Sequence, residues 1–368
     1  MKLLALPLVV VLACPCLARA ADPAAIRGAI AKATAFLEKR QAADGSFSAE
    51  VGPAVTALAV TALAKSGTPA DAPVVQKAIA HLLSFKRPDG GIYVPESPVS
   101  NYETALAMVA LAACNTDGRY DKEIKGCEAF VKGLQWDDGE GKGKADPAYG
   151  GAGYGTKGRP DLSNTQFMIE ALRSIGASEN DPAIQKALVF VSRTQNLEGP
   201  ENTTPFAGKN TNADDKGGFY YTPAAGGESQ AGGSPDGGLR SYGSMTYAGL
   251  KSMIFAGLDK DDYRVKAALA WLGRHYTFKE NPGMGQAGLF YYFHTAAKSL
   301  DVLGVETFTD AAGKEHPWRA ELSDEIIALQ KPDGSWVNPN NRWMEDNPDL
   351  VTSYALLALA YCLPPADR

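Results

Sequence analysis

A short turn recurs along the chain, and this repeat constrains the fold more than any other feature of the sequence. Each copy places glutamine or lysine three residues before an Asp-Gly pair or a close variant of it. The copies span residues 41–47, 86–92, 135–139, 195–199 and 330–336, with a degenerate copy at 279–283. Glycine supplies the positive φ of such a turn and aspartate caps it. Six copies predict a structure of six similar units.

An apolar segment led by a threonine follows each turn. The threonines are Thr56, Thr104, Thr165, Thr246, Thr295 and Thr352. The segments 54–64, 105–114 and 351–362 contain no charge, and a helix of that composition must be covered on all sides. Segments between the units, such as 124–134, carry apolar residues at helical spacing with polar residues between them. We therefore predict an all-α chain, an (α/α)6 toroid in which six inner and six outer helices form a closed double ring.

The N-terminus has the features of a signal peptide. Lys2 precedes an apolar stretch over residues 3–17, which is too short to span a bilayer, and Ala18-Arg19-Ala20 fits a cleavage site. Lipidation of Cys14 is the less favoured alternative, because the residues before Cys14 match a lipidation box imperfectly. We expect a secreted or periplasmic protein that does not span the membrane. The domains would be a signal peptide, 1–20, and a single toroid, 21–368.

Composition excludes several classes of partner and cofactor. The net charge is −6 and no basic stripe is present, which argues against nucleic-acid binding. Beyond the leader, the cysteines are Cys114, Cys127 and Cys362, an odd number that gives no disulfide framework. Cys114 and Cys127 could still meet in a disulfide, or all three could be buried thiols. The four histidines form no Cys/His cluster, so we expect no metal site and no cofactor.

The turn at 330–336, Gln-Lys-Pro-Asp-Gly-Ser-Trp, resembles the QW repeat of squalene and oxidosqualene cyclases and of protein prenyltransferase β subunits. The resemblance extends over about residues 21–364 and implies the α/α toroid of that superfamily. It implies a squalene cyclase- and prenyltransferase-like repeat protein. It does not fix an activity, because the same toroid serves several functions.

The motifs that carry chemistry in those families are degenerate in this chain. The resemblance to class II cyclases implies an Asp-x-Asp-Asp-Thr acid motif at an inner-helix start, and the corresponding residues 161–165 read Asp-Leu-Ser-Asn-Thr. Ser163 stands where the proton donor is expected. The resemblance to prenyltransferases implies zinc ligands on the fifth and sixth inner helices, but residues 289–295 contain no cysteine and Val351 stands where histidine is expected.

We expect any site to lie at the cavity mouth, where the inner helices begin, because the two longest loops, 139–162 and 199–240, lead into those helices. Aromatic side chains near these positions can stack on a ligand. The candidate catalytic residues are Asp161 and His294, the latter expected at a helix start. The candidate ligand-binding residues are Tyr102, Glu103, Asn164, Tyr242, Tyr291 and Asp349.

Two functions remain open at this point. The first is a protein that binds an apolar or aromatic-stacking ligand, small or polymeric, or another protein, at the mouth. The second is an exported enzyme on the same toroid, either an atypical terpenoid cyclase or a polysaccharide hydrolase or lyase. Its acids would be drawn from Glu103, Asp161, Asp236, Glu345, Asp346 and Asp349. Helix capping explains several of these acids equally well, since negative charge suits a helix N-terminus.

Overall fold

The structure is a computed structural model that describes residues 20–156, 158–209 and 212–365. This part of the chain contains twelve α-helices and two short antiparallel strands, β1 (Phe308–Thr309) and β2 (Glu315–His316). The prediction of a mostly helical chain is therefore confirmed. The apolar stretch and Cys14 of the predicted signal peptide lie outside the described residues.

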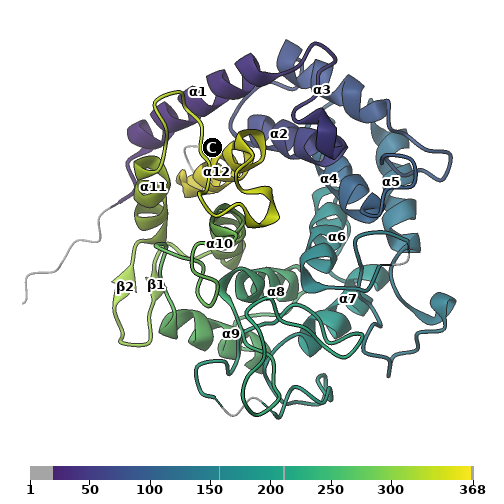
Figure 1. Cartoon of the computed structure of the whole chain (residues 1–368), viewed down its shortest axis with the longest axis vertical. Coiled ribbons are helices and arrows are strands. Elements are labelled where there is room, and N and C mark those ends of the chain that lie inside the picture. The colour runs from purple at the N-terminus through teal and green to yellow at the C-terminus, as the bar shows by residue number, and fades with distance from the viewer. Residues whose placement is uncertain (1–19, 157, 210–211, 366–368) are drawn as a thin grey trace, which may run out of the picture.

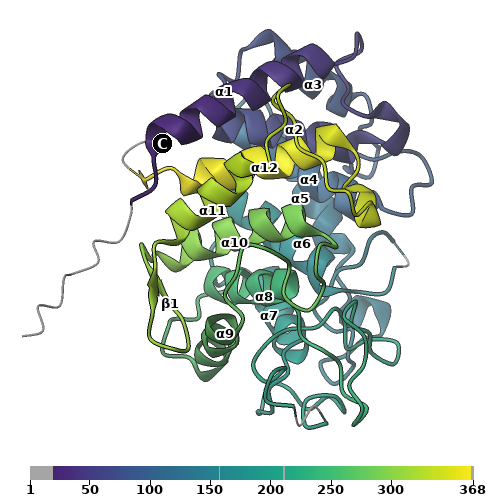
Figure 2. The same ribbon diagram turned by 60° about the vertical axis from the view of Figure 1, so that its left-hand side comes forward.

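Six helices surround a central lumen (Figure 1). They are α2 (Pro53–Lys65), α4 (Ser100–Ala113), α6 (Leu162–Ser174), α8 (Gly243–Phe255), α10 (Leu289–Leu303) and α12 (Pro348–Cys362). Each packs against the next in chain order, and α12 packs against α2. Figure 2 shows α12 between α2 and α10, which joins the last unit to the first.

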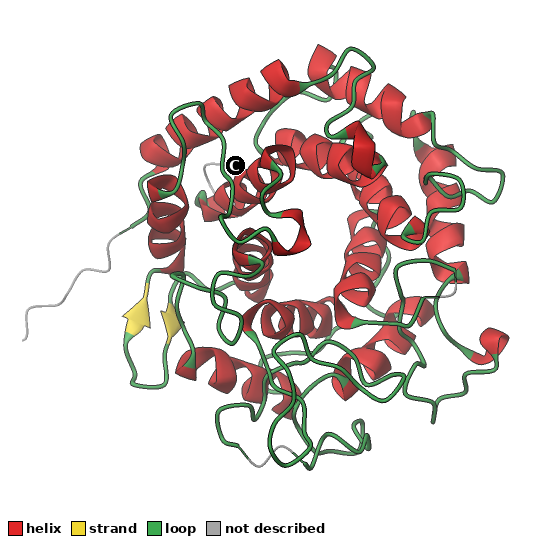
Figure 3. Ribbon diagram, in the orientation of Figure 1, coloured by secondary structure: helices red, strands yellow, loops and turns green. Residues whose placement is uncertain are grey.

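The other six helices lie outside this inner ring (Figure 3). They are α1 (Pro23–Arg40), α3 (Pro73–Leu83), α5 (Asp121–Gly133), α7 (Pro182–Arg193), α9 (Tyr263–Arg274) and α11 (Trp318–Ala328). Each packs against one or two inner helices. Three single-turn 3₁₀ helices, η1 (Ala49–Val51), η2 (Asp138–Glu140) and η3 (Arg342–Met344), lie in the loops that lead into inner helices. The outer helices bury one face each, whereas the inner helices are buried almost throughout, as their compositions predict.

The glutamine of the repeated turn connects neighbouring outer helices. Nε2 of Gln41, at the end of α1, donates to the Gly45 carbonyl within the turn (3.1 Å) and to the Val74 carbonyl in α3 (2.7 Å). Gln330, after α11, donates to the Gly334 carbonyl and to the Ala29 carbonyl of α1, both at 3.0 Å. The last turn thus binds the first helix in the way that the first turn binds the next outer helix.

Two separate constraints, the backbone conformation and a close contact, require glycine in this turn. Gly45 and Gly334 have φ values of 90° and 93°, in the region that side chains disfavour. A Cβ at Gly45 would overlap the Lys77 carbonyl oxygen, and one at Gly334 would overlap that of Lys32. The turn therefore approaches the neighbouring outer helix backbone to backbone.

In the third and fourth units, insertions separate the glutamine from its glycine. Nε2 of Gln135 donates to the Gly150 and Ala183 carbonyls, both at 2.8 Å. Nε2 of Gln195 donates to the Gly217 and Arg264 carbonyls, both at 2.9 Å. Assigning these turns to residues 135–139 and 195–199 was therefore wrong at the glycine end. Gly150 and Gly217 have the positive φ and the close approach to the next outer helix, which adjacency in sequence could not reveal.

The recurring threonine ties each turn to its inner helix. Thr56 Oγ1 accepts from the Phe47 backbone N–H at 2.9 Å, and Thr352 Oγ1 accepts from that of Trp336 at 3.2 Å. The same bond occurs at Thr104, Thr165 and Thr246. In α10, Thr295 donates to the Tyr291 carbonyl one turn earlier, as Thr104, Thr165 and Thr246 also do in their helices, but within the described residues no backbone N–H of a turn donates to it. The fifth unit, whose turn is degenerate, is thus also the unit in which the described residues lack this bond.

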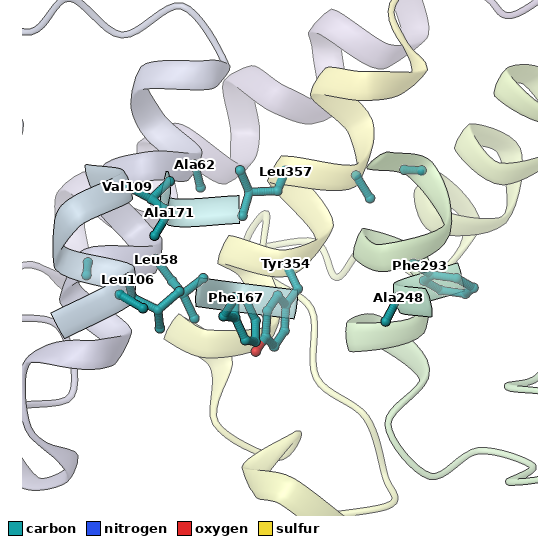
Figure 4. Close-up of a cluster of buried hydrophobic side chains, with 14 of the residues drawn as sticks. Leu58, Ala62, Leu106, Val109, Phe167, Ala171, Ala248, Phe293, Tyr354 and Leu357 are labelled. Carbon is teal, nitrogen blue, oxygen red and sulfur yellow. The ribbon is translucent and has the colours of Figure 1, made fainter. Parts of the chain in front are cut away.

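Apolar side chains of successive inner helices pack against one another along the inner ring. Figure 4 shows Leu58, Phe167 and Tyr354 among them. Cys114, Cys127 and Cys362 are buried free thiols, so no disulfide joins Cys114 to Cys127. In the described ranges, no helix combines the length and the hydropathy of a membrane span.

Candidate functional site

A cavity of about 300 Å³ lies where the inner helices begin, and all six inner helices contribute to its wall. We call it the mouth chamber. Its wall is largely apolar and includes eight aromatic side chains: Tyr102, Tyr154, Phe167, Tyr221, Tyr242, Tyr291, Trp343 and Tyr354. The volume is at the lower end of the range for small-molecule sites.

The aromatic rings form a connected cluster. The Phe167 ring lies 5.3 Å from that of Tyr102, edge to face, and 6.2 Å from that of Tyr291. The rings of Tyr291 and Tyr354 meet edge to face at 5.9 Å. The hydroxyls of Tyr102 and Tyr354 lie 3.3 Å apart, within hydrogen-bond distance. Burial raises the pKa of Tyr102 to about 12, so this hydroxyl stays protonated near neutral pH.

Three loops complete the wall. Tyr154 comes from the loop before α6, and Tyr221 and Gln230 come from the loop before α8, so both long loops lie at the mouth as predicted. The third loop precedes α12 and brings Trp343 and Met344, both with positive φ. The candidate set did not include these two residues, although Trp343 is an aromatic residue close before an inner helix.

Glu345 anchors this third loop to α10. Its Oε1 accepts from the Tyr291 backbone N–H at 2.8 Å, and its Oε2 accepts from Asn338 Nδ2 at 2.7 Å. Burial raises its pKa, while the Asn338 side chain and the backbone N–H groups at the start of α10 oppose that shift. Glu345 thus serves as an N-terminal cap for α10 supplied by a distant loop.

Of the predicted ligand-binding residues, Tyr102, Tyr242 and Tyr291 line the mouth chamber together. The hydroxyl of Tyr291 lies 3.0 Å from Ser163 Oγ, so Ser163 hydrogen-bonds to a tyrosine of the wall. Three residues of the predicted binding set therefore converge, from α4, the start of α8 and α10.

Asp161 is the N-cap of α6 and lies behind the wall of the chamber. Its Oδ1 accepts from the Asn164 backbone N–H and its Oδ2 from Asn164 Nδ2, both at 2.8 Å. Asn164 is thus the partner of Asp161 and is not part of the wall. Burial raises the pKa of Asp161 to about 6, while hydrogen bonds from Asn164 and Tyr221 oppose the shift. Tyr221 connects this carboxyl to the chamber.

Asp349 and Glu103 lie outside the mouth chamber, contrary to their predicted place in the site. Asp349 Oδ1 accepts from Arg40 Nε at 2.9 Å and Oδ2 accepts from Ser48 Oγ at 2.8 Å, which joins α12 to α1 and to the first turn. Glu103 packs against Gly52, and its pKa is raised by burial and held back by Ser97. Both acids lie within the first turns of their helices, α4 and α12, and point toward neighbouring elements.

His294 lies deeper than expected. Helix α10 begins at Leu289, so His294 is in its second turn and faces a second cavity of about 330 Å³, toward the other end of the lumen. We call this cavity the lower chamber. The prediction that His294 opens a helix was wrong, because the aromatic residues before it already belong to α10. Burial lowers the pKa of His294 to about 3, so the ring is neutral near pH 7.

The candidate acids and base therefore have separate surroundings. Among the described residues, Glu345 is the one carboxylate in the wall of the mouth chamber. Glycoside hydrolysis requires a pair of carboxyl groups across the scissile bond. Within residues 20–365, apart from the three that the structure leaves undescribed, no group of three His, Cys, Asp or Glu side chains is placed to hold a metal ion.

The sequence interpretation missed a charged cluster in the inner ring. Glu170 of α6 lies between Lys251 of α8 and Lys298 of α10, with Lys251 Nζ 2.6 Å from Glu170 Oε2 and Lys298 Nζ in contact with Oε1. Lys251 is the one charged residue of α8, and Glu170 and Lys298 lie in helices that each contain one further charge, so the pattern of sparse charges is visible in the sequence.

Comparison with known proteins supports the resemblance that the turn motif indicated. Residues 50–212, less than half of the chain, match the family described as the squalene-hopene cyclase C-terminal domain. A search of curated proteins found no match.

Solved structures extend the similarity of fold to most of the chain. The type II terpene cyclase MstE from Scytonema, without ligand, aligns with a TM-score of 0.56 and 14% identity, covering 92% of this chain and 98% of its own. A single-residue variant of MstE in complex with geranylgeranyl dihydroxybenzoate, its substrate, aligns with a TM-score of 0.55 at 14% identity, covering 92% and 97%. A protein from Actinoplanes aligns with a TM-score of 0.52 at 12% identity, covering 92% and 98%. At these identities the matches show a shared fold.

Proposed function

We propose that this chain is a terpenoid cyclase-like (α/α)6 toroid that binds an apolar small molecule in its mouth chamber. The ring closes where α12 meets α2 and where Gln330 binds α1. The observation that carries the proposal is the chamber itself, whose wall combines side chains from all six inner helices with eight aromatic rings. Such a wall recognises an apolar or aromatic ligand by burial and stacking.

The usual acid of a class II cyclase is missing from this chamber. By the resemblance of residues 161–165 to the cyclase motif, Ser163 stands where the proton donor is expected, and it is hydrogen-bonded to Tyr291. A serine hydroxyl does not protonate an alkene, so we propose binding without cyclisation. The substrate named for the MstE complex is a prenylated benzoate, and a prenylated compound is a chemically reasonable first ligand for this chamber.

The proposal is tested by adding geranylgeranyl dihydroxybenzoate to the purified protein and measuring both binding and product. We expect binding, detected by native mass spectrometry and titration calorimetry, with no cyclised product by liquid chromatography and mass spectrometry. Tyr291→Ala should weaken binding at least tenfold. Tyr263→Ala, which changes a tyrosine on outer helix α9, is the matched control and should bind as the wild type does. Equal binding by both variants would place the ligand elsewhere.

An atypical enzyme is the second candidate, and one observation favours it. Asp161 is a buried carboxyl with a pKa raised to about 6, and Tyr221 links it to the mouth chamber. A carboxyl of this kind is partly protonated near neutral pH, as a general acid must be. Formation of a cyclised product that is lost in Asp161→Asn would support this candidate over simple binding.

We also propose that residues 1–20 are a signal peptide and that the protein is secreted or periplasmic. The support is the arrangement of Lys2, the apolar stretch and the Ala18-Arg19-Ala20 site. N-terminal sequencing of the mature protein should begin at Ala21. A lipid-modified cysteine at position 14 would favour the anchored alternative.

A further inference from the structure

The lower chamber differs from the mouth chamber in its chemistry. It shares Leu58 and Phe167 with the mouth chamber, so the two cavities adjoin along the lumen. Its remaining wall contains the polar side chains Lys65, Glu170, Arg173, His294, Lys298 and Tyr361. Three of these are cations and one is a carboxylate, so positive charge predominates at this end of the lumen.

The ion cluster beside the lower chamber carries an unbalanced charge. Glu170 contacts both Lys251 and Lys298, and the three side chains are largely removed from solvent. Two ammonium groups around one carboxylate leave one net positive charge. A charge in a low-dielectric interior is costly unless a further partner compensates it. Arg173 adds a cation to the wall: its guanidinium donates to the Ala177 carbonyl and lies over the Phe255 ring.

His294 supplies an independent observation at the same place. It is 3% exposed, lines the lower chamber, and its Nδ1 is buried without a hydrogen-bond partner in the described structure. Its ring stacks on Tyr354 at 5.6 Å, which fixes its orientation. One turn further along α10, Lys298 lines the same cavity. A buried polar atom without a partner is destabilising unless a ligand or water satisfies it.

We propose that the lower chamber binds an anionic group, a carboxylate or phosphate, carried at one end of the apolar ligand that occupies the mouth chamber. Lys298 and Arg173 supply the positive charge, and the neutral ring of His294 donates an N–H to that group or accepts a hydrogen bond from its hydroxyl. The proposal rests on the proposed function, because it adds a polar end to the same ligand.

The spacing of the two chambers sets the minimum length of such a ligand. Tyr291 in the mouth chamber and Lys298 in the lower chamber are seven residues apart on α10, a rise of about 10 Å. The apolar part of the ligand must exceed this length to reach both sites. A sixteen-carbon chain does so, which makes hexadecanoate and hexadecanol suitable probes that differ only at the polar end.

The test compares the binding of hexadecanoate, hexadecanol and inorganic phosphate by calorimetry at pH 7. We expect hexadecanoate to bind at least tenfold more tightly than hexadecanol. Lys298→Gln should reduce this preference to less than twofold, and Lys298→Arg should retain most of it. The wild-type comparison of acid and alcohol needs no variant, so the proposal stays testable if Lys298→Gln does not fold. Arg173→Gln, at a half-buried position, should then reduce the preference about threefold.

The outcomes separate this proposal from the proposed function. Equal binding of acid and alcohol would overturn the anionic site and leave the apolar site standing. Binding of phosphate that depends on Lys298, without binding of either chain, would support the anionic site and count against the apolar ligand. Failure of all three probes to bind would overturn the anionic site.

Discussion

The two halves of the inner ring are built on one repeat but differ in what they present to the lumen. In the half formed by α12, α2 and α4, which we call the plain half, the helix interiors are uncharged. In the half formed by α6, α8 and α10, which we call the charged half, each helix carries one member of the cluster Glu170, Lys251 and Lys298. Charged side chains are thus buried in the ring where three neighbouring helices bring a carboxylate and two ammonium groups into contact.

Two turns of the charged half differ from the turns of the plain half. In the plain half each glutamine or lysine lies close to its glycine, as in residues 41–47 and 330–336. In the third and fourth units, insertions separate Gln135 from Gly150 and Gln195 from Gly217. Tyr154 and Tyr221, which line the mouth chamber, lie four residues after the displaced glycines Gly150 and Gly217. The contacts of the turn glutamine and glycine are therefore kept in each of these units, while the length of chain between the two residues varies.

The largest effect in the plain half is expected from replacing the aromatic residue of the last turn. Trp336 is fully buried, and its indole N–H donates to the Ile326 carbonyl of α11 at 2.7 Å. Trp336→Ala should lower the free energy of unfolding by about 3–5 kcal/mol, measured by guanidinium denaturation. Trp343→Ala is the control, since Trp343 is 44% exposed, and should change stability by about 0.5 kcal/mol at most. Similar effects of the two substitutions would mean that the turn does not stabilise the ring.

The corresponding test of the charged half is removal of the shared carboxylate. Glu170→Gln leaves Lys251 and Lys298 without their common partner and should cost about 3 kcal/mol. Burial already lowers the pKa of Lys251 to about 8, so this lysine can release its proton and limit the loss. Lys298→Gln keeps the ion pair of Glu170 and Lys251, so it should lower the free energy of unfolding by less than Glu170→Gln does. Denaturation of both variants at pH 7 measures the difference. A larger loss in Lys298→Gln would contradict the shared-partner arrangement.

The displaced turn glycine gives a matched pair within the third unit. Gly150 has a φ of 82°, and a Cβ there would overlap the Lys186 carbonyl oxygen of α7. Gly150→Ala should therefore cost about 2 kcal/mol, from backbone strain and overpacking together. Gly139→Ala should cost about 0.5 kcal/mol or less, because only the Asp137 side chain lies nearby. If Gly139→Ala lowered the melting temperature more than Gly150→Ala, the turn would instead have to be assigned to residues 135–139.

The smallest effect concerns Asp161 and depends on pH. Burial raises its pKa from 3.8 to about 6 in the folded chain, so between these values the folded state holds a proton that the unfolded state has lost. Stability from this group is present below pH 4 and is lost as the pH rises through about 6. Asp161→Asn keeps a good N-cap residue but does not titrate. The stability of the wild type relative to this variant should fall between pH 4 and 7, and a constant difference would contradict the raised pKa.

The sequence predicted the helices and their alternation well, because local features determine them. Uncharged segments such as 351–362 must be buried, and the Asp-Gly turns mark the ends of outer helices. The threonine of each unit was recognised by its recurrence, and in five units its hydrogen bond to the turn explains that recurrence. The sequence also predicted where the mouth lies, because the longest loops precede inner helices.

The directions of individual side chains could not be predicted in the same way. Asp349 and Glu103 both lie in first helical turns, but their partners Arg40 and Gly52 belong to other units and are distant or unmarked in the sequence. His294 was misplaced by about one turn because the start of α10 is not marked by a capping residue; Gly288 precedes it. The cluster around Glu170 joins residues up to 128 positions apart, which no local pattern shows.

The hydrogen bond from Gln330 to Ala29 has a consequence for how the molecule responds to loss of a unit. In an open array of repeats, each terminal unit has one neighbour, and removing it sacrifices one interface. Here residues 301 positions apart in sequence are partners, so the sixth unit borders both the fifth and the first. Deleting any unit removes two interfaces and exposes to water the sides of the two neighbouring inner helices that packed against it. The protein should therefore unfold as a whole when it is shortened, whereas an open array would lose only the repeat that was cut away.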